Sequence, residues 1–380
     1  MAKKSTKDSD DKKEPKPKIT SVFEGLDDLN PYGALLSESA LSIVDSWTDT
    51  GSYALNAIIS GSCYRGVQNG RVIVFCGPSG CGKTLLTMKI VGNHLREADD
   101  NFAVVFDSEI AVDAQTASNL GADPSRIRHY PVKTVNEARN QVLKLLNNIA
   151  ELGLQKKCMV VIDSLGMLAG GKETADAEKD KDAADMGLRA KELRGLLRII
   201  TWPAAISKTT VLCTNHVYVS PSEMFPSAVN HQSGGEGPVY AASLIVQLGF
   251  LREKNEEDFK DEEMIAIAKK VGGITMHALT TKNRFIPQML TTDLYLNFKT
   301  GLDKYSGLFE MAKAFNIIQG ANKYSCGDVL LGFRKEFERD PDTWENILLP
   351  KLEAVVKKEF TFHSDADDLK KEVAKLNESK

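Results

Sequence analysis

The chain has 380 residues, of which 42% are hydrophobic and 26% charged, as is typical of a soluble globular protein with two or three domains. No apolar stretch approaches the roughly 20 residues that span a membrane, and the N-terminus lacks the apolar core of a secretory signal. The six scattered cysteines have no zinc-type spacing, which favours free thiols in a reducing cytoplasm. A net charge of −4 excludes a surface coated in positive charge but is compatible with a local basic groove.

The two ends of the chain differ in composition from its middle. Residues 1–20 combine many lysines and acids with two prolines and no aromatic residue, so we predict a disordered tail. In residues 21–69 the apolar positions fall mostly at helical spacing, but the region is too short for a robust domain, which predicts an N-terminal subunit-interaction segment. Residues 301–380 are charged and mostly helical in pattern, which predicts a helical C-terminal region.

Residues 70–300 alternate between apolar runs typical of strands and amphipathic stretches typical of helices. Such alternation indicates an α/β fold with a twisted, mainly parallel sheet that is covered by helices on both faces. Residues 271–298 add further strand-like runs. The expected strands are Arg71–Cys76, Phe102–Phe106, Met159–Ile162, Thr210–Thr214 and Leu244–Leu248, and the expected helices are Thr84–Ala98, Val135–Leu152 and Asp185–Ile200.

The strongest local motif matches G-x-x-x-x-G-K-[ST] completely and lies between a strand-like run and an apolar helix. In that setting the glycines let backbone N–H groups surround phosphate oxygens, and the helix N-terminus adds partial positive charge. Lys83 would contact the β- and γ-phosphates and the Thr84 hydroxyl would hold Mg²⁺, so the motif predicts ATP and magnesium as cofactors. The residues of this phosphate loop are Gly77, Pro78, Ser79, Gly80, Cys81, Gly82, Lys83 and Thr84.

Three other strand-like runs end in polar residues. Asp163 follows Cys158–Ile162, as in a Walker B strand whose carboxylate orients Mg²⁺ and its waters. Glu109 follows the run at residues 102–106 and could activate the attacking water, or it could cap a helix. His216 follows the run at residues 210–214 and could sense the γ-phosphate, or it could be a structural histidine.

Long polar segments follow two of these strands, at the sheet edge where ligands bind in open α/β folds. The first covers residues 169–182 and the second residues 218–237. Segments of this length within a compact core are usually functional or disordered. The second contains Met224 and Phe225, a pair that could stack on bases or could anchor the loop in a small buried site.

Several motifs, in the same order along the chain, resemble those of RecA-type recombinases, especially the UvsX recombinases of tailed phages. They are GPSGCGKT, VFDSE, VVIDSLGMLAGGKETADA, ADMGLRAKELRGLLRI and TNHVYVSPSEMF. The resemblance covers about residues 50–320 and implies a RecA-type P-loop core. The first 30 and last 60 residues are not covered by it.

The resemblance also implies roles for individual residues. Glu109 matches the water-activating glutamate of the family, and His216 matches its switch residue. Lys282 and Arg284 fall where the family has two lysines that reach the γ-phosphate of a neighbouring subunit, and Asp113 matches a nucleotide-contacting aspartate. An exposed charged helix face is the alternative for the two arginines among the implied DNA contacts. Those contacts are Lys172, Arg189, Arg194, Met224, Phe225, Gly234 and Gly235.

The implied function is an ATP-dependent recombinase for phage recombination, repair and recombination-dependent replication. Such a DNA-dependent ATPase forms helical filaments on single-stranded DNA and exchanges strands with a homologous duplex. The implied partners are both DNA forms, further copies of the chain, and mediator and single-strand-binding proteins, with the host-cell cytoplasm as the expected location and no membrane. Two alternatives stay open: a ring-forming DnaB-like helicase, and an ATP-gated recombination mediator without strand exchange.

Overall fold

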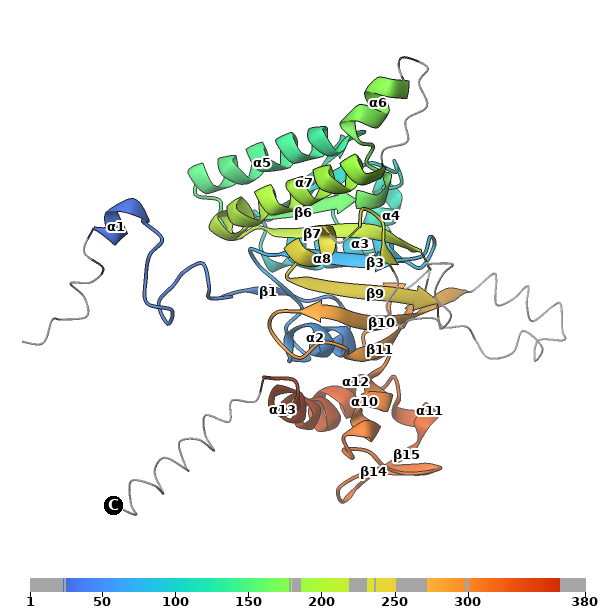
Figure 1. Ribbon diagram of the computed structural model, residues 1–380. Coiled ribbons are helices and arrows are strands. Elements are labelled where there is room, and N and C mark those ends of the chain that lie inside the picture. The colour runs from blue at the N-terminus through green and yellow to red at the C-terminus, as the bar shows by residue number, and fades with distance from the viewer. Residues whose placement is uncertain are drawn as a thin grey trace, which may run out of the picture. The chain divides into compact units, whose positions relative to one another are not determined.

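The computed structural model describes residues 23, 25–177, 179, 186–218, 231–235, 237–250, 272–297 and 301–362 (Figure 1). The chain divides into two compact units, residues 1–44 and 45–380. The described part of the first unit holds one short helix, α1 (Leu26–Leu29), and exposes large apolar side chains such as Leu29 and Leu36, each more than four-fifths accessible. The predicted tail at residues 1–20 lies outside the described residues.

The second unit begins at residue 45 and therefore includes residues 45–69. That residues 21–69 form a subunit-interaction segment stays a prediction. Strand β1 (Trp47–Thr48) pairs with β2 (Val67–Gln68). Helix α2 (Tyr53–Ser60) is capped by the Ser52 side chain and buries its apolar residues in one cluster with β3, β10 and β11. Helical spacing predicts this helix but cannot show which partner fills its apolar face.

The second unit is built on a large mixed sheet with the order β12-β11-β10-β9-β3-β7-β6-β4-β5, in which β8 also pairs with β7. The strands that follow one another from β9 through β3, β7, β6 and β4 to β5 are parallel. Beyond β9, the strands β10, β11 and β12 extend the sheet with antiparallel pairing. The predicted, mainly parallel sheet is therefore confirmed. The strands are β3 (Val72–Gly77), β4 (Phe102–Asp107), β5 (Ile127–Pro131), β6 (Cys158–Asp163), β7 (Thr210–Tyr218), β8 (His231–Gln232), β9 (Leu244–Phe250), β10 (Gly273–Asn283), β11 (Thr291–Asn297) and β12 (Gly301–Leu302).

Helices cover both faces of this sheet, because alternate side chains of each buried strand point to opposite sides. Ile73 and Phe75 of β3 join the cluster that contains α2 and α3 (Lys83–Glu97), whereas Val72 and Val74 join the cluster of α5 (Val135–Glu151) and α7 (Met186–Ser207). Helices α5 and α7 pack against each other on that second face (Figure 1). The shorter helices are α4 (Ala114–Asn119), η2 (Pro124–Arg126), η3 (Leu165–Met167), α6 (Gly171–Ala177) and α8 (Gly237–Ala241).

The C-terminal region combines the predicted helices with a small antiparallel sheet, β13-β14-β15, for which the sequence pattern gave no indication. Its strands are only two to five residues long, so they are too short to show a clear alternation of polar and apolar residues. Trp344 and Phe337 are fully buried in the same cluster as α2. The elements are α10 (Leu308–Ala314), β13 (Gln319–Gly320), β14 (Lys323–Cys326), β15 (Val329–Phe333), α11 (Arg334–Phe337), α12 (Pro341–Thr343), η4 (Trp344–Leu348) and α13 (Leu349–Glu359).

A buried carboxylate joins α13 to the loop after α2. Glu353 accepts hydrogen bonds from Ser62 Oγ at 2.6 Å and Cys63 N at 2.6 Å, and it pairs with Lys357 at 2.9 Å. Burial alone would raise the pKa of Glu353, but the hydrogen bonds from Ser62, Lys357 and Cys63 hold it below its ordinary value. A lowered carboxyl pKa stabilises the fold above the unfolded pKa of about 4.3, and this stabilisation is lost as the pH falls through the folded pKa.

We therefore expect Glu353→Gln to lower the free energy of unfolding by about 1–3 kcal/mol at neutral pH, because a buried charged acceptor is removed. The difference in unfolding free energy between the variant and the parent should be full at pH 7 and should shrink by about pH 3, as the pH falls below the unfolded pKa of about 4.3 and the parent carboxylate takes up its proton. Urea unfolding at both pH values measures this difference. The exposed Glu359→Gln on the same helix is the control. A difference in unfolding free energy between Glu353→Gln and the parent that does not change with pH would contradict the prediction.

All six cysteines lie within the described residues, and each is buried and unpaired, as the scattered spacing predicted. Burial raises the pKa of Cys63, Cys158 and Cys213, and it raises the pKa of Cys76 to about 12. These thiols are therefore protonated and poorly reactive at neutral pH. None of the helices in the described ranges is both long and apolar enough to cross a membrane.

Candidate nucleotide and magnesium site

The phosphate loop joins the end of β3 to the start of α3, as the motif predicted. Gly80 and Gly82 have φ angles of 78° and 88°, a left-handed conformation that favours glycine, and Gly82 is the N-cap of α3. The Lys83 side chain is buried and folds back into the loop, where Nζ donates to Gly77 O at 3.0 Å and Pro78 O at 2.8 Å. The loop therefore holds a positive charge beside the N-terminus of α3, where a phosphate group is stabilised.

Gly77 is required for steric reasons. A Cβ atom at this position would lie 2.4 Å from Leu248 O and 2.7 Å from Cys81 Sγ, so we expect Gly77→Ala to destabilise the fold by about 1–3 kcal/mol. Gly195 in α7 is the matched control, because no atom lies within 4 Å of its Cβ position and alanine favours a helix by up to about 1 kcal/mol. Thermal unfolding compares the two variants, and equal melting temperatures would refute the steric argument.

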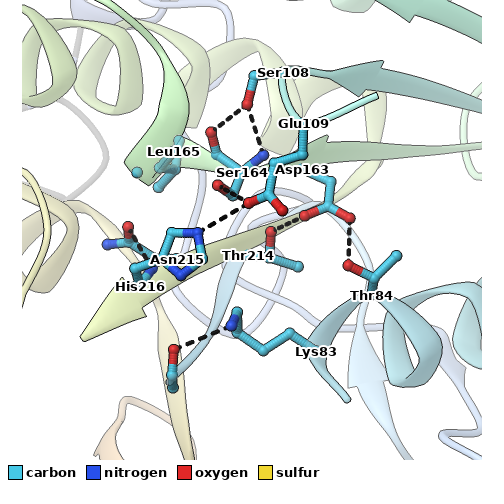
Figure 2. A network of polar contacts seen from close by, with 12 residues as sticks. Lys83, Thr84, Ser108, Glu109, Asp163, Ser164, Leu165, Thr214, Asn215 and His216 are labelled. Carbon is cyan, nitrogen blue, oxygen red and sulfur yellow. Dashed lines mark hydrogen bonds and ion pairs between the residues drawn. The ribbon is translucent and has the colours of Figure 1, made fainter. Parts of the chain in front are cut away.

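Asp163 lies at the end of β6 and connects the phosphate loop to β7 (Figure 2). Its Oδ2 accepts from Thr84 Oγ1 at 2.7 Å, and its Oδ1 accepts from Thr214 Oγ1. Burial raises the pKa of Asp163, and the two threonine hydroxyls oppose that rise. The described residues hold no cluster of three or more His, Cys, Asp or Glu side chains placed to bind a metal. Two oxygen donors fit Mg²⁺, which usually keeps water and phosphate oxygens as its other ligands.

Glu109 is held beside this pair by two neighbouring strands (Figure 2). Its Oε1 accepts from Ser164 Oγ at 2.6 Å and lies 2.9 Å from His216 Nε2. A carboxylate oxygen accepts and a ring N–H donates, so Nε2 is the donor in the second contact. Because Asp107 of β4 lies opposite Asp163 of β6, Glu109 and Asp163 emerge at the same edge of the sheet. The arrangement brings the Glu109 carboxylate, the oxygen donors of Thr84 and Asp163, and the Lys83 ammonium group to one edge of the sheet.

Ser164, Thr214 and Asn215 also belong to the site, although the sequence did not single them out. The backbone N–H of Ser164 donates to Ser108 Oγ at 2.9 Å, and this hydrogen bond fixes the turn after β6 against the turn after β4. Asn215 is fully buried and donates to Ser233 O at 3.0 Å, which ties β7 to the turn after β8. The available signal was positional, because each residue lies at or just beyond the carboxyl end of a predicted strand.

Comparison with known proteins supplies an independent observation. The RecA N-terminal domain family matches residues 34–303. The chain is 28% identical over 291 residues to the recombination and repair protein of Enterobacteria phage T4, which covers 76% of this chain and 69% of that protein. It is 24% identical over 362 residues to Protein RecA of Campylobacter hominis, with 93% and 97% covered. It is also 25% identical over 288 residues to Protein RecA of Thermus thermophilus, with 76% and 77% covered.

The chain belongs to the RecA family.

The predicted resemblance to RecA-type recombinases, and with it a function in recombination and repair, is thereby confirmed. Family membership explains why the polar residues at three strand ends converge on the phosphate loop. Family membership does not assign a role to each predicted residue. The geometry shows which of the predicted residues lie at the phosphate loop and which lie elsewhere.

Within one chain, Lys282 and Arg284 do not lie beside Lys83, Asp163 and Glu109. Both lie near the end of β10, where Lys282 is paired with Ile245 at the start of β9, towards the amino-terminal edge of the parallel strands. Lys282 Nζ donates to Val239 O and to Tyr240 O at 3.1 Å, and Arg284 donates to the same Tyr240 oxygen. Burial, with a smaller effect of Arg284, lowers the pKa of Lys282 to about 8.

Asp113 has a clear local role as the N-cap of α4. Its carboxylate accepts from Thr116 N at 2.9 Å and from Thr116 Oγ1 at 2.5 Å, and these bonds lower its pKa. Within the described ranges it makes no hydrogen bond to the phosphate loop. Its predicted contact with the nucleotide therefore stays a prediction.

The predicted DNA-contacting residues fall into three groups in this RecA-family chain. Arg189 is engaged internally, because Nε donates to Leu168 O at 2.7 Å and Nη2 donates to Leu165 O and Gly166 O, which clamps the segment after β6. Gly234 and Gly235 have positive φ angles and pack over α7, so their conformation alone accounts for glycine. The remaining predicted contacts are Lys172 and Arg194, which are exposed on α6 and α7, and Met224 and Phe225, which lie outside the described residues.

Proposed function

We propose that this RecA-family chain is an ATP-hydrolysing recombinase that assembles with further copies on single-stranded DNA and exchanges strands with a homologous duplex. The observation that carries the proposal is the convergence of Lys83, Thr84 and Asp163 with the Glu109–His216 pair at one edge of the sheet. This set supplies a phosphate-binding charge, magnesium ligands and a general base, which together are the requirements for phosphoryl transfer to water.

The chain's own residues divide the hydrolysis between them. Lys83 would stabilise the charge that develops on the transferred phosphoryl group, and Glu109 would orient and deprotonate the attacking water. Thr84 and Asp163 would hold Mg²⁺, which when bound neutralises charge on the β- and γ-phosphates. Asp163 is already positioned by Thr84 and Thr214, so these two ligands need little rearrangement on binding.

His216 supports a coupling between hydrolysis and DNA binding. It lies on β7, which ends at Tyr218, directly before the predicted second DNA segment. A ligand that changes the Glu109–His216 contact would bias the ordering of that segment. The edge location of Lys282 and Arg284, remote from the cluster of their own chain, supports a contribution to the site of a neighbouring copy. A head-to-tail interface of this type produces either rings or an open helix.

The assembly experiment is imaging on long single-stranded DNA with a non-hydrolysable ATP analogue. We expect continuous helical filaments, and none with Lys83→Ala. Rings threaded on DNA would favour a DnaB-like helicase. Filaments that form without strand exchange or ATP turnover would favour an ATP-gated mediator.

DNA affinity should fall steeply as salt concentration rises, because neutralising phosphates releases counterions.

We expect Phe225→Ala to weaken binding to single-stranded DNA roughly tenfold, in line with the loss of one base-stacking contact. ATP turnover without DNA should stay at the parental rate, since the phosphate loop and Glu109 are unchanged. Fluorescence anisotropy with a labelled oligonucleotide measures the affinity, and Leu154→Ala, at an exposed position beyond α5, is the control. A parallel loss of DNA-free turnover would indicate a role in folding instead.

A further inference from the structure

Asp107 is a fully buried carboxylate that the nucleotide chemistry described above does not use. It is the last residue of β4, and it accepts hydrogen bonds from four consecutive backbone N–H groups. Oδ1 accepts from Glu109 N at 2.9 Å and Ile110 N at 2.7 Å, and Oδ2 accepts from Ala111 N at 3.1 Å and Val112 N at 3.2 Å. The whole loop that carries Glu109 is therefore wrapped around one side chain.

A fifth donor comes from the neighbouring strand. His129 of β5 places Nε2 3.0 Å from Asp107 Oδ2, and its side chain is 37% accessible, so the pair connects the buried carboxylate to the protein surface. Burial would raise the pKa of Asp107, but the hydrogen bonds from His129 and the backbone outweigh burial and lower it. Asp107 thus stays ionised, which its role as acceptor for all five donors requires.

The loop needs this support because its backbone is strained. Ile110 has a φ of 55°, a left-handed conformation that is unfavourable for a β-branched residue, and its side chain is 78% accessible, so packing does not hold it there. Among the described residues, the hydrogen bonds from the loop backbone to Asp107 offset the strain at Ile110. Releasing them would let Ile110 relax and move the backbone of its neighbour Glu109.

We propose that Asp107 and His129 are positioning residues that fix the carboxylate of Glu109 for attack on the nucleotide. Asp107 holds the Glu109 backbone from one side, while Ser164 and His216 hold the Glu109 side chain from the other. The hydrogen bond from His129 orients Oδ2 of Asp107 and so helps to hold the loop in place. This role rests on the proposed function of Glu109 as the general base, and it adds two residues outside the phosphate loop on which turnover depends.

The test measures steady-state ATP turnover and nucleotide affinity on single-stranded DNA for the full chain. His129→Leu, which removes the donor, is expected to lower kcat about tenfold, and Asp107→Asn by up to about a hundredfold, because small displacements of a catalytic group are costly. KM and nucleotide affinity should stay near parental values. His129→Gln, which can donate from a similar position, should recover most of the lost turnover. His277→Leu is the control, since His277 forms a similar surface pair with Asp293 on β10 and β11, at the other side of the sheet.

A double-variant cycle separates positioning from a general effect on folding. With Glu109→Gln already present, His129→Leu should cause no further loss of kcat, because the group that it positions has been removed. An equal, additional loss in that background, or parental turnover of His129→Leu alone, would overturn the positioning role and leave the proposed function intact. Parental turnover of Glu109→Gln alone would instead overturn the proposed general base, and the positioning role with it. The His129 variants keep the test decisive if Asp107→Asn fails to fold.

Discussion

Glu109→Gln is expected to lower ATP turnover by about 10²–10⁴-fold, the usual contribution of a positioned general base. The amide keeps the size of the side chain and can still accept from Ser164 Oγ, so the local structure should be preserved. It cannot take a proton from water. Nucleotide affinity should remain near the parental value, because Glu109 makes no contact with Lys83 or Thr84 among the described interactions.

Phosphate release measures turnover, and a fluorescent ATP analogue measures binding. Glu151→Gln is the matched control, since Glu151 is the exposed last residue of α5. If the Glu109 variant hydrolyses ATP at a near-parental rate, another group activates the water. If it loses nucleotide binding to the same extent as turnover, Glu109 acts on binding and not on the chemical step.

Asp163→Asn should reduce turnover by about 10²–10³-fold, because a magnesium ligand supplies several kcal/mol of charge stabilisation in the transition state. The remaining activity should need more magnesium, which a titration of turnover against metal concentration reveals. Stability should respond differently. Burial raises the pKa of Asp163, so its ionised form is disfavoured in the folded protein, and a neutral amide removes that cost.

We therefore expect the metal-free melting temperature of Asp163→Asn to equal or exceed that of the parent. Thermal unfolding in a chelator tests this, with the exposed Asp99→Asn as the control. A lower melting temperature together with lost turnover would mean that the variant is misfolded, and the magnesium role would then have no support from its activity.

The convergence of the site could be predicted because it follows from strand order and direction. Parallel strands carry their carboxyl ends to one edge, so Thr84, Glu109, Asp163 and His216 had to approach one another once the strands were recognised. The register confirms this, with Gly77 opposite His216 and Asp107 opposite Asp163. The phosphate loop is equally local, since its spacing and glycines define it without any knowledge of distant residues.

What could not be predicted depends on contacts between distant parts of the chain. The exposed strand β5 has no apolar pattern, yet it brings His129 to Asp107. Arg189 has the same sequence environment as a solvent-facing arginine on α7, but its guanidinium is engaged by carbonyl oxygens of the segment after β6. The boundary at residue 45 likewise depends on where the apolar face of α2 packs. Periodicity reports one face of an element and not the partner of that face.

The burial of all six cysteines has a practical consequence for testing the proposed assembly on DNA. Because each native thiol is buried, a cysteine introduced at an exposed position such as Ser118 or Asn119 of α4 would be the thiol that reacts fastest with a maleimide dye. A fluorophore could then be attached at one chosen point without replacing native residues of the core. Energy transfer between dyes on adjacent copies would report assembly and disassembly in real time.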